Sequence, residues 1–429
     1  ILWESKEMIA PSRLAVIRAC EAVFGRGERC PEQWNQSLNP ADATLAHAIL
    51  GKIFRHWGKI QAYVDEALTR SDKNLPLETR ITLALGLSQL AWLSGVAYYA
   101  AVNESVTWIS DPHQGFPAHQ GLVNAILRQA ARERPSLAEK IEAYPHYLDQ
   151  SLFTKHALRH ALGPDFSPTH SQSLWRQWNQ PPRFCFRILE TSQPLPEGLI
   201  PDAVLEGCWR LDEGAAFPSE WLLQNHGMVQ DRSSQALLSF NWDRPVQTIL
   251  DLCAAPGGKS TGLHFNYPEA QLTCIEKHPK KAEKLKSTLQ SRQIEGSVIT
   301  ADARVWLSEG DDQFDLIWLD APCSASGTLQ KHPDLTWIGD QIDLELLCKT
   351  QEELLSAALP RLSPGGLLVY SVCSWFPQEG IDHQKTMLER YPQIQPATIW
   401  SPTLGGSTFQ LKPLEWEGEG FQGFALSPR

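Results

Sequence analysis

The chain has 429 residues, 42% of them apolar, and a net charge of −11. This length suffices for roughly two or three globular domains, and the negative charge excludes bulk attraction to nucleic acid, so any RNA binding has to use local basic patches. The nine cysteines form no C-x-x-C pair and no His/Cys cluster at ligand spacing, so we expect no metal site and, without a secretory leader, a reducing cytoplasm.

The first part of the chain, from Pro11 to about Tyr144, is predicted to be helical. Apolar residues such as Ile49, Ile53 and Trp57 recur at helical spacing, and Pro and Gly mark the connections. We therefore assign residues 1–144 to one helical domain.

One stretch of this domain, Ile81 to Val102, carries no charge and is long enough to cross a membrane. However, polar residues such as Ser88 and Gln89 interrupt it, its flanks lack a basic cluster, and Ser94-Gly95 indicates a break between two shorter helices. We expect a buried core here and no membrane span.

A further helix is expected from Gly121, with Arg128, Arg132 and Arg134 on its outer face. Their spacing favours a solvated face over an RNA contact. Three segments in this order resemble the helices of NusB-type domains, namely Leu85–Leu90, Ala100–Glu104 and Gly121–Arg128. That resemblance implies an all-helical RNA-binding domain.

Residues 145–245 are predicted to form a connecting subdomain. A helix is expected over Leu152–Leu162, and prolines follow it. Aromatic and basic residues alternate over Trp175–Arg183, which suits single-stranded RNA because arginine reaches phosphate while rings stack on bases. An ordinary small core explains the same residues equally well, so both interpretations stay open.

The segment Thr248–Lys259 has the pattern of a cofactor cradle. An apolar run ends at Asp251, and a turn of small residues follows, which lets backbone approach a ligand before a helix begins. A phosphate-binding P-loop requires Gly at the position of Cys253, and a dinucleotide fingerprint is absent. Both nucleotide interpretations are therefore weakened.

Further apolar runs after the cradle also end in a polar or reactive residue. They are Gln271–Glu276, Ser297–Asp302, Phe314–Asp320 (leading to Cys323) and Gly366–Cys373. Because helices are expected between them, over Lys259–Tyr267 and Pro279–Arg292, residues 246–429 are predicted to form an α/β domain with a doubly wound parallel sheet and ligands at the carboxyl ends of its strands.

The residues at these strand ends indicate methyl-transfer chemistry. In a methyltransferase-like sheet, Glu276 is placed to accept the ribose hydroxyls of S-adenosylmethionine and Asp302 the adenine amino group. With a sheet order of 3-2-1-4-5, the fourth and fifth strands are neighbours. We therefore expect Cys323 and Cys373 to face one pocket.

Cytosine explains why a site would hold two cysteines. A thiolate that adds to C6 of the ring makes C5 nucleophilic enough to accept a methyl group, and a second group must assist release of the adduct. Asp320 is placed to hydrogen-bond the N3 or N4 edge of the base. The base has to be unpaired or flipped out, because C6 is unreachable inside a stacked helix.

Three motifs resemble the signatures of RNA cytosine-5 methyltransferases: Asp251–Lys259, Asp320–Gly327 with Lys331–Asp334, and Tyr370–Ser374. With the NusB-like front, the chain resembles the RsmB (Sun/Fmu) family of bacterial 16S rRNA methyltransferases. The resemblance implies a multidomain protein with an all-α NusB-like domain, a small α+β connecting subdomain and a C-terminal class I (Rossmann-like) methyltransferase domain.

The same resemblance assigns the site residues. Cys373 would be the nucleophile and Cys323 the residue that assists release. The S-adenosylmethionine site would be lined by Cys253, Ala254, Ala255, Pro256, Gly257, Gly258, Lys259, Glu276, Asp302 and Asp320. We expect a cytoplasmic monomer acting on small-subunit ribosomal RNA, with no membrane or metal partner.

The chain departs from the family pattern at a few positions. Glu276 stands where the family usually has Asp, Leu189 ends an expected Arg-x-Asn, and Gln422-Gly423 interrupts an expected Gly-Phe-Phe. Two rival functions remain: a transfer RNA methyltransferase with the same chemistry, and a catalytically idle RNA-binding factor. A small-molecule or protein methyltransferase ranks third, since it needs neither the cysteine pair nor the helical front.

Overall fold

The computed structural model describes residues 9–68, 74–189, 194–240, 242–400, 405–411 and 416–429. The chain forms two compact units. The first comprises residues 1–156 with 175–181 and 332–342, and the second comprises 157–174, 182–331 and 343–429. The three-part division at 144 and 245 stays a prediction.

The first unit is helical, as predicted. Its main helices are α1 (Pro11–Cys20), α2 (Pro40–Ala67), α3 (Leu77–Trp92), α4 (Tyr98–Ser110), α5 (Gln120–Arg132) and α6 (Arg134–Glu142). α2 begins at Pro40 because the Asn39 side chain accepts a hydrogen bond from Asp42 N at 2.9 Å, and it kinks at His56.

The long uncharged stretch 81–102 is divided between α3 and α4, as its Ser-Gly break predicted. In the described part of the chain, no helix is both long and apolar enough to cross a membrane. Leu83, Leu85 and Leu87 of α3 are fully buried. The apolar run is therefore part of the core of this unit.

The prediction that one helix carries three arginines was wrong for Arg134. α5 ends at Arg132, and Arg134-Pro135 opens α6, since proline is favoured in the first helical turn. Arg134 Nη2 donates to the carbonyl groups of Leu93 and Val96 at 3.0 and 2.9 Å. Arg134 thus stabilises the α3–α4 connection, whereas Arg128 and Arg132 are exposed.

The connecting region contains two helices, α7 (Leu152–Leu162) and α8 (Pro168–Trp178). α7 has the predicted bounds. Trp175 and Trp178 are only 3% and 6% exposed, so they do not present rings on which RNA bases could stack. For these two residues, the core interpretation is confirmed and the RNA interpretation was wrong.

The second unit contains a small antiparallel sheet in the order β2-β3-β1-β4. Its strands are β1 (Cys185–Ile188), β2 (Leu199–Pro201), β3 (Cys208–Leu211) and β4 (Gly227–Val229). The short helices α9 (Ser219–Leu223) and α10 (Arg232–Leu238) flank β4 in the sequence. This region is therefore α+β, as predicted.

The large sheet of the second unit has the order β10-β14-β9-β8-β5-β6-β7. Its parallel strands are β5 (Thr248–Leu252), β6 (Gln271–Glu276), β7 (Ser297–Thr300), β8 (Phe314–Asp320) and β9 (Leu362–Val372). Numbered along the chain, these strands have the predicted order 3-2-1-4-5. The chain ends in antiparallel strands β10 (Ile394–Pro396), β13 (Thr408–Leu411) and β14 (Phe421–Pro428), and β14 pairs with β9.

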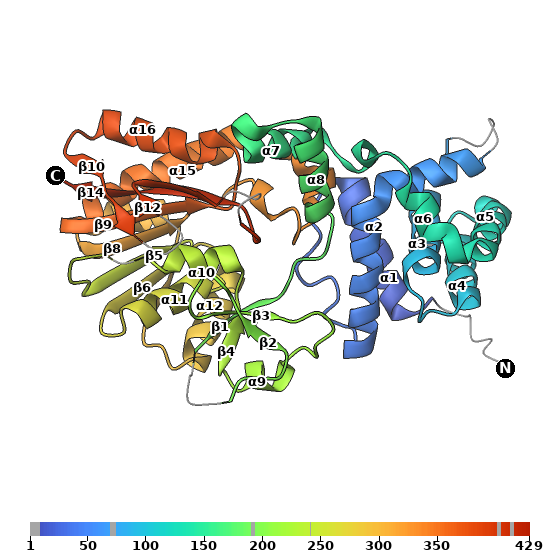
Figure 1. Cartoon of the computed structure of the whole chain (residues 1–429), viewed down its shortest axis with the longest axis horizontal. Helices are drawn as coiled ribbons and strands as arrows, with labels where there is room; N and C mark the ends of the chain where they lie inside the picture. The colour runs from blue at the N-terminus through green and yellow to red at the C-terminus, as the bar shows by residue number, and fades with distance from the viewer. Residues whose placement is uncertain (1–8, 69–73, 190–193, 241, 401–404, 412–415) are drawn as a thin grey trace. The chain divides into compact units, whose positions relative to one another are not determined.

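Helices cover both faces of this sheet (Figure 1). One face packs against α10, α11 (Gly258–Asn266) and α12 (Pro279–Ser291), and the other against α13 (Ala303–Glu309), α15 (Leu344–Ala358) and α16 (Ile381–Arg390). Successive residues alternate between the two cores: Ile249 belongs to the first and Leu250 to the second. A sheet buried on both faces requires strands that are apolar throughout, which is the pattern the sequence shows.

One strand begins earlier than predicted. β9 starts at Leu362 instead of Gly366, because Leu362 pairs with Phe314 across a register shift between Phe314 and Leu316. Pro364 and Gly365 lie in this irregular segment. The carboxyl end of β9, which carries Cys373 next to it, lies where it was expected.

Candidate active site

The loop between β5 and α11 has the shape of a cofactor cradle. Cys253 and Gly257 adopt positive φ values of 61° and 100°. A Cβ atom added to Gly257 would lie 2.9 Å from Leu285 Cδ1, so both the backbone conformation and the packing require glycine there. Gly257 is also the N-cap of α11, whose first amide groups thus border the loop.

A cavity of about 330 Å³ lies against this loop. The predicted site residues that line it are Cys253, Ala254, Ala255, Pro256, Gly258, Lys259 and Asp320. The other predicted residues, all within the described chain, are not part of that lining: Gly257, Glu276, Asp302, Cys323 and Cys373.

Asp251 lies at the floor of the cavity and is fully buried. Its Oδ2 accepts a hydrogen bond from Ser260 Oγ at 2.5 Å, and its Oδ1 has no partner among the described residues. Burial raises the pKa of the Asp251 carboxyl to about 7, although the Ser260 hydrogen bond opposes the shift. A buried oxygen without a partner is costly, so a polar ligand atom in the cavity would stabilise it.

Lys259 and Asp320 form an ion pair across the cavity. Lys259 Nζ lies 2.6 Å from Asp320 Oδ2, and Ser371 Oγ donates to Asp320 Oδ1 at 3.0 Å. Burial opposes the charge on Lys259, but attraction to Asp320 outweighs it and raises the pKa of the lysine. Lys259 also interacts electrostatically with Cys373 and lies 4.9 Å from the Phe421 ring centroid. A fixed positive charge is therefore present in the lining of the cavity.

The structure brings the two predicted cysteines together. Cys323 follows β8, Cys373 follows β9, and their Sγ atoms are 3.4 Å apart. Both side chains are partly exposed. The hydrogen bond to Cys373 and burial raise the pKa of Cys323 well above the ordinary thiol value. This arrangement holds one thiol in the protonated form within reach of the other.

Glu276 is the last residue of β6, and Asp302 follows β7 by two residues, so both lie at the carboxyl ends of the predicted strands. Glu276 is 6% exposed and accepts a hydrogen bond from His278 N at 2.9 Å. Asp302 is the N-cap of α13, and its hydrogen bonds from Arg304, at 2.7 and 3.0 Å, hold the pKa of its carboxyl well below the usual range. These hydrogen-bond partners of Glu276 and Asp302 were not predicted from the sequence.

One wall of the cavity comes from residues that were not predicted. Met228, Gln230 and Asp231, which lie in or follow β4, line it together with Lys331. Gln230 accepts a hydrogen bond from Arg187 Nε at 2.9 Å and donates to Gly258 O at 3.0 Å, so it joins the small sheet to the cofactor loop. The only sequence signal was their position just before the catalytic sheet.

The last residue of the second motif has a structural role that was not predicted. Asp334 is 4% exposed and belongs to the segment 332–342 of the first unit. Its Oδ2 accepts hydrogen bonds from Arg29 Nε at 2.9 Å and from Cys30 N at 3.2 Å. Nearby, Trp337 Nε1 donates to Phe54 O at 2.7 Å. The chain that follows the motif is thus packed into the helical unit.

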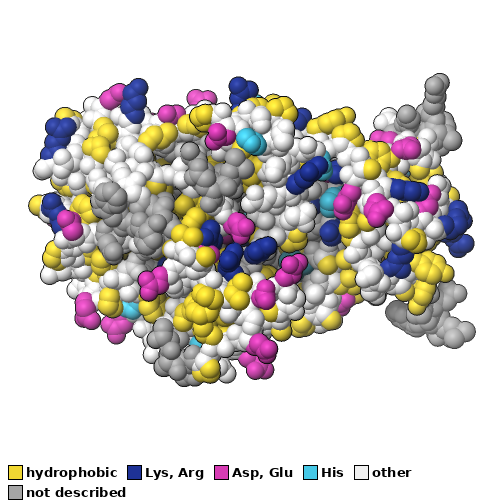
Figure 2. Space-filling model, in the orientation of Figure 1, with side chains coloured by type: hydrophobic (Ala, Val, Ile, Leu, Met, Phe, Trp, Pro, Cys, Tyr) yellow, Lys and Arg dark blue, Asp and Glu magenta, His cyan; other side chains and the backbone are white. Residues whose placement is uncertain are grey.

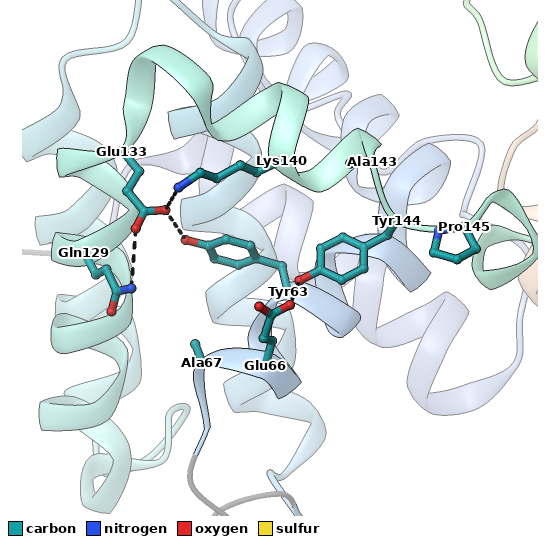
Figure 3. A pocket seen from close by; sticks show the side chains of 9 residues that line it. All are labelled: Tyr63, Glu66, Ala67, Gln129, Glu133, Lys140, Ala143, Tyr144 and Pro145. Atoms are coloured by element: carbon teal, nitrogen blue, oxygen red, sulfur yellow. Dashed lines mark hydrogen bonds and ion pairs between the residues drawn. The ribbon is translucent and has the colours of Figure 1, made fainter.

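A second cavity, of about 550 Å³, lies among α2, α5 and α6 in the first unit (Figure 3). Tyr63 donates a hydrogen bond to Glu133 at 3.3 Å, Lys140 forms an ion pair with Glu133 at 3.0 Å, and Tyr144 donates to Glu66. Burial and the neighbouring Glu133 raise the pKa of Tyr63 to about 12. These contacts tie the three helices together.

The surface carries charges of both signs. On the face drawn in Figure 2, Lys and Arg side chains lie among Asp and Glu side chains, and the described atoms form no continuous basic area. In the described parts of the chain, no group of three or more His, Cys, Asp or Glu side chains has an arrangement that could hold a metal ion.

Comparison with known proteins shows the family of the chain. The family described as 16S rRNA methyltransferase RsmB/F matches residues 242–421, and the NusB family matches residues 11–132. Ribosomal RNA small subunit methyltransferase B of Salmonella paratyphi B is 30% identical over 427 residues, which cover 95% of this chain and 96% of the relative. The protein of the same name from Salmonella paratyphi A is 29% identical with the same coverage.

Solved structures show the same fold. The crystal structure of PH0851 aligns with a TM-score of 0.70 at 20% identity, covering 97% of this chain and 99% of that one. NSun6 from Pyrococcus horikoshii, solved with SFG, aligns with a TM-score of 0.52 at 15% identity, covering 63% and 97%. The cradle, the unpartnered Asp251 oxygen and the cavity fit S-adenosylmethionine. The chain belongs to the RsmB family of methyltransferases, with a NusB-family domain before its catalytic sheet and S-adenosylmethionine as its cofactor.

Proposed function

We propose that this chain transfers a methyl group to C5 of a cytosine in 16S ribosomal RNA, through a covalent bond between Cys373 and C6 of the base. The observation that supports this most directly is the pair of thiols 3.4 Å apart, beside the Lys259–Asp320 ion pair. The names of its relatives, ribosomal RNA small subunit methyltransferase B, support the RNA target.

The cofactor would lie in the cavity beside the β5–α11 loop. Residues Cys253 to Lys259 would enclose it, Glu276 would accept the ribose hydroxyls and Asp302 the adenine amino group. When bound, S-adenosylmethionine supplies the electrophilic methyl group. Asp251, which also lines the cavity, would offer its unpartnered oxygen to the cofactor.

Cys373 is the proposed nucleophile. Its thiolate adds to C6 of cytosine, a C6–S bond forms, and the electron pair of the C5–C6 double bond becomes available at C5 for methylation. Cys323 stays protonated in this step because its own pKa is raised.

Release of the methylated base breaks the C6–S bond that formed in the first step. A base removes the proton from C5, the electron pair restores the C5–C6 double bond, and the C6–S bond breaks to return the Cys373 thiolate. We assign Cys323 to assist this step, since its sulfur is within hydrogen-bonding distance of Cys373. Its thiol donates a hydrogen bond to the departing thiolate.

Asp320 would orient the base. It is the last residue of β8, its side chain is one-third exposed, and it is fixed by Lys259 and Ser371. Its carboxylate would bond the N3 or N4 edge as charge develops there. The target base would have to leave its stack to reach this position.

The rest of the chain would bind the RNA. We propose three parts: a NusB-like domain at 1–144, a connecting recognition subdomain at 145–245 and the methyltransferase domain at 246–429. The net charge of the protein is negative, and charges of both signs are mixed on its surface. RNA would therefore be bound through local contacts and not through attraction by the net charge of the protein. We propose that the protein acts as a monomer in the cytoplasm.

The test is incubation with tritium-labelled S-adenosylmethionine and separate pools of unmodified ribosomal and transfer RNA, followed by nucleoside analysis. We expect label in 5-methylcytidine from small-subunit RNA. Label only in transfer RNA would keep the mechanism and overturn the target. Cofactor binding without label in either RNA would indicate that a partner from the assembly particle is missing, whereas loss of cofactor binding as well would favour the idle RNA-binding factor.

A further inference from the structure

Glu379 connects the two cysteine loops. It lies in the 3₁₀ turn Pro377–Glu379, six residues after Cys373, and it is fully buried. Its Oε1 accepts hydrogen bonds from Ser324 N at 2.8 Å and Gln351 Nε2 at 3.0 Å. Its Oε2 accepts from Ser324 Oγ and Ser374 Oγ, both at 2.5 Å. Ser324 and Ser374 directly follow Cys323 and Cys373, so one carboxylate holds the residue after each cysteine.

Neighbouring contacts reinforce this arrangement. Gln351 Nε2 also donates to Pro322 O at 2.8 Å, so the Cys323 loop is held on both sides of the cysteine. Tyr370 of β9 donates to Glu379 O at 2.7 Å, which fixes the turn that carries the glutamate. The two serine hydroxyls lie 3.2 Å apart. The carboxylate is therefore the centre of a buried network that joins β9 to the loop after β8.

The four hydrogen-bond donors around Glu379 require an acceptor at each of its two side-chain oxygen positions. A carboxylate accepts hydrogen bonds at both oxygens and donates none, whereas an amide offers one acceptor and one donor group. The four donors named above are uncharged, so Glu379 is held by hydrogen bonds and not by a cation among them. A buried charge held in this way is costly to assemble, and partly satisfied networks are less stable than complete ones. We therefore expect the Glu379 carboxylate to have a role beyond packing in the core.

We infer that Glu379 is a positioning residue that holds the Cys323 loop against Cys373, and that it is needed for release of the covalent RNA adduct. Cys373 follows directly on β9 and its carbonyl accepts from Gly327 N at 3.0 Å, whereas Cys323 lies in a loop. Loss of the carboxylate should therefore move Cys323 more than Cys373. Adduct formation needs Cys373, and release needs both.

This inference rests on the proposed function, and the experiment separates the two. Wild type, Cys323→Ala, Glu379→Gln, Glu379→Ala and Glu389→Gln are incubated with S-adenosylmethionine and unmodified small-subunit RNA, and adducts are resolved on a denaturing gel. Glu389→Gln is the matched control, because Glu389 is an exposed residue of α16 that takes no part in the network. Glutamine has nearly the same shape as glutamate, but its side-chain amide accepts hydrogen bonds at only one of the two positions where the carboxylate accepts them.

We expect Glu379→Gln to accumulate adduct as Cys323→Ala does and to slow turnover by about 100-fold, the loss that misplacement of a reacting group by 1 Å can cause. Its KM for RNA and its affinity for S-adenosylmethionine should equal those of Glu389→Gln. Adduct should disappear when the Cys373→Ala substitution is combined with Glu379→Gln in one protein. Glu379→Ala should show the same accumulation, or lose folding, in which case Glu379→Gln decides.

Two results would overturn the inference in different ways. If Cys323→Ala accumulates adduct while Glu379→Gln does not, or if Glu379→Gln loses cofactor affinity in step with turnover, the glutamate has only a structural role. If neither wild type nor Cys323→Ala forms a Cys373-dependent adduct or 5-methylcytidine, the proposed function fails and the inference with it.

Discussion

Lys259 Nζ lies 2.6 Å from Asp320 Oδ2, and this contact joins the cofactor loop to the end of β8. Lys259 lies in the first turn of α11 and Asp320 ends a strand 61 residues later, and both line the cavity in which the cofactor would bind. The lysine side chain is 11% exposed and the aspartate side chain 32%. The pair therefore combines a desolvated cation with a carboxylate that remains open to a substrate.

Lys259→Met should lower turnover by roughly 100-fold, because Asp320 loses the charge that orients it towards the base. The loss of unfolding free energy should be only about 1 kcal/mol, since Asp320 is partly solvated. Steady-state kinetics and urea unfolding measure the two effects. Lys280→Met, on the exposed face of α12, is the control and should behave as wild type; equal kinetics in both variants would contradict the role of the pair.

Cys373→Ala should lower turnover by at least about 1000-fold, because no other group forms the bond to C6. Cys323→Ala should instead trap the covalent RNA adduct, which appears as a slow band on a denaturing gel. Cys348→Ala, which removes a partly exposed thiol of α15, is the control. Normal turnover in the Cys373 variant would exclude the covalent mechanism.

Asp251 should make the stability of the protein depend on pH. Its pKa of about 7 in the folded chain lies above the ordinary 3.8, so between about pH 4 and 7 the folded state keeps a proton that the unfolded chain has released. Stabilisation by this group is complete below the unfolded pKa and is lost as the pH rises through 7, by roughly 4 kcal/mol in total.

Asp251→Asn removes this dependence. Relative to wild type, the variant should gain unfolding free energy as the pH rises from 4 to 7, which urea titrations across that range measure. Asp149 in the first unit, whose pKa burial also raises to about 7, contributes equally to both proteins. Parallel stability curves for the two proteins would show that Asp251 is ionised normally in the fold.

Asp334→Ala should reduce the unfolding free energy of the protein by about 1–3 kcal/mol, because it leaves the amide of Cys30 without its acceptor. Arg29→Ala should cost less than about 1 kcal/mol, since the arginine is 47% exposed and its loss leaves the acceptor bonded to Cys30. Denaturant unfolding separates the two. An equal loss in both variants would mean that the ion pair, and not the buried amide, holds this segment.

Much of the fold was predictable because it depends on local patterns. Gln271–Glu276 and Phe314–Asp320 are strands with the predicted bounds, since continuous apolar runs of that length suit a sheet buried on both faces. The Ser94-Gly95 break between α3 and α4 was also correctly predicted. Arg134 was misplaced, because a turn of one residue between two helices leaves little trace in apolar spacing.

The burial of Trp175 and Trp178 could not be predicted, since an alternation of rings and basic residues suits both a core and an RNA surface. The partners of Asp302 were likewise hidden. A carboxylate after a strand was expected to face a ligand, but the same position caps α13 and pairs with Arg304. In both cases, the side chain's environment depended on elements elsewhere in the chain.

The sequence by itself determined the order of the strands, the cradle after β5 and the pairing of Cys323 with Cys373 at adjacent strand ends, because a right-handed parallel sheet allows few arrangements of these segments. Only the tertiary structure decided that Met228, Gln230 and Asp231 form a wall of the cavity, that Asp334 is packed into the helical unit, and that Glu379 holds both cysteine loops. Those contacts join residues far apart in the chain, and they depend on side-chain packing and on which buried donors lack a partner, neither of which periodicity records.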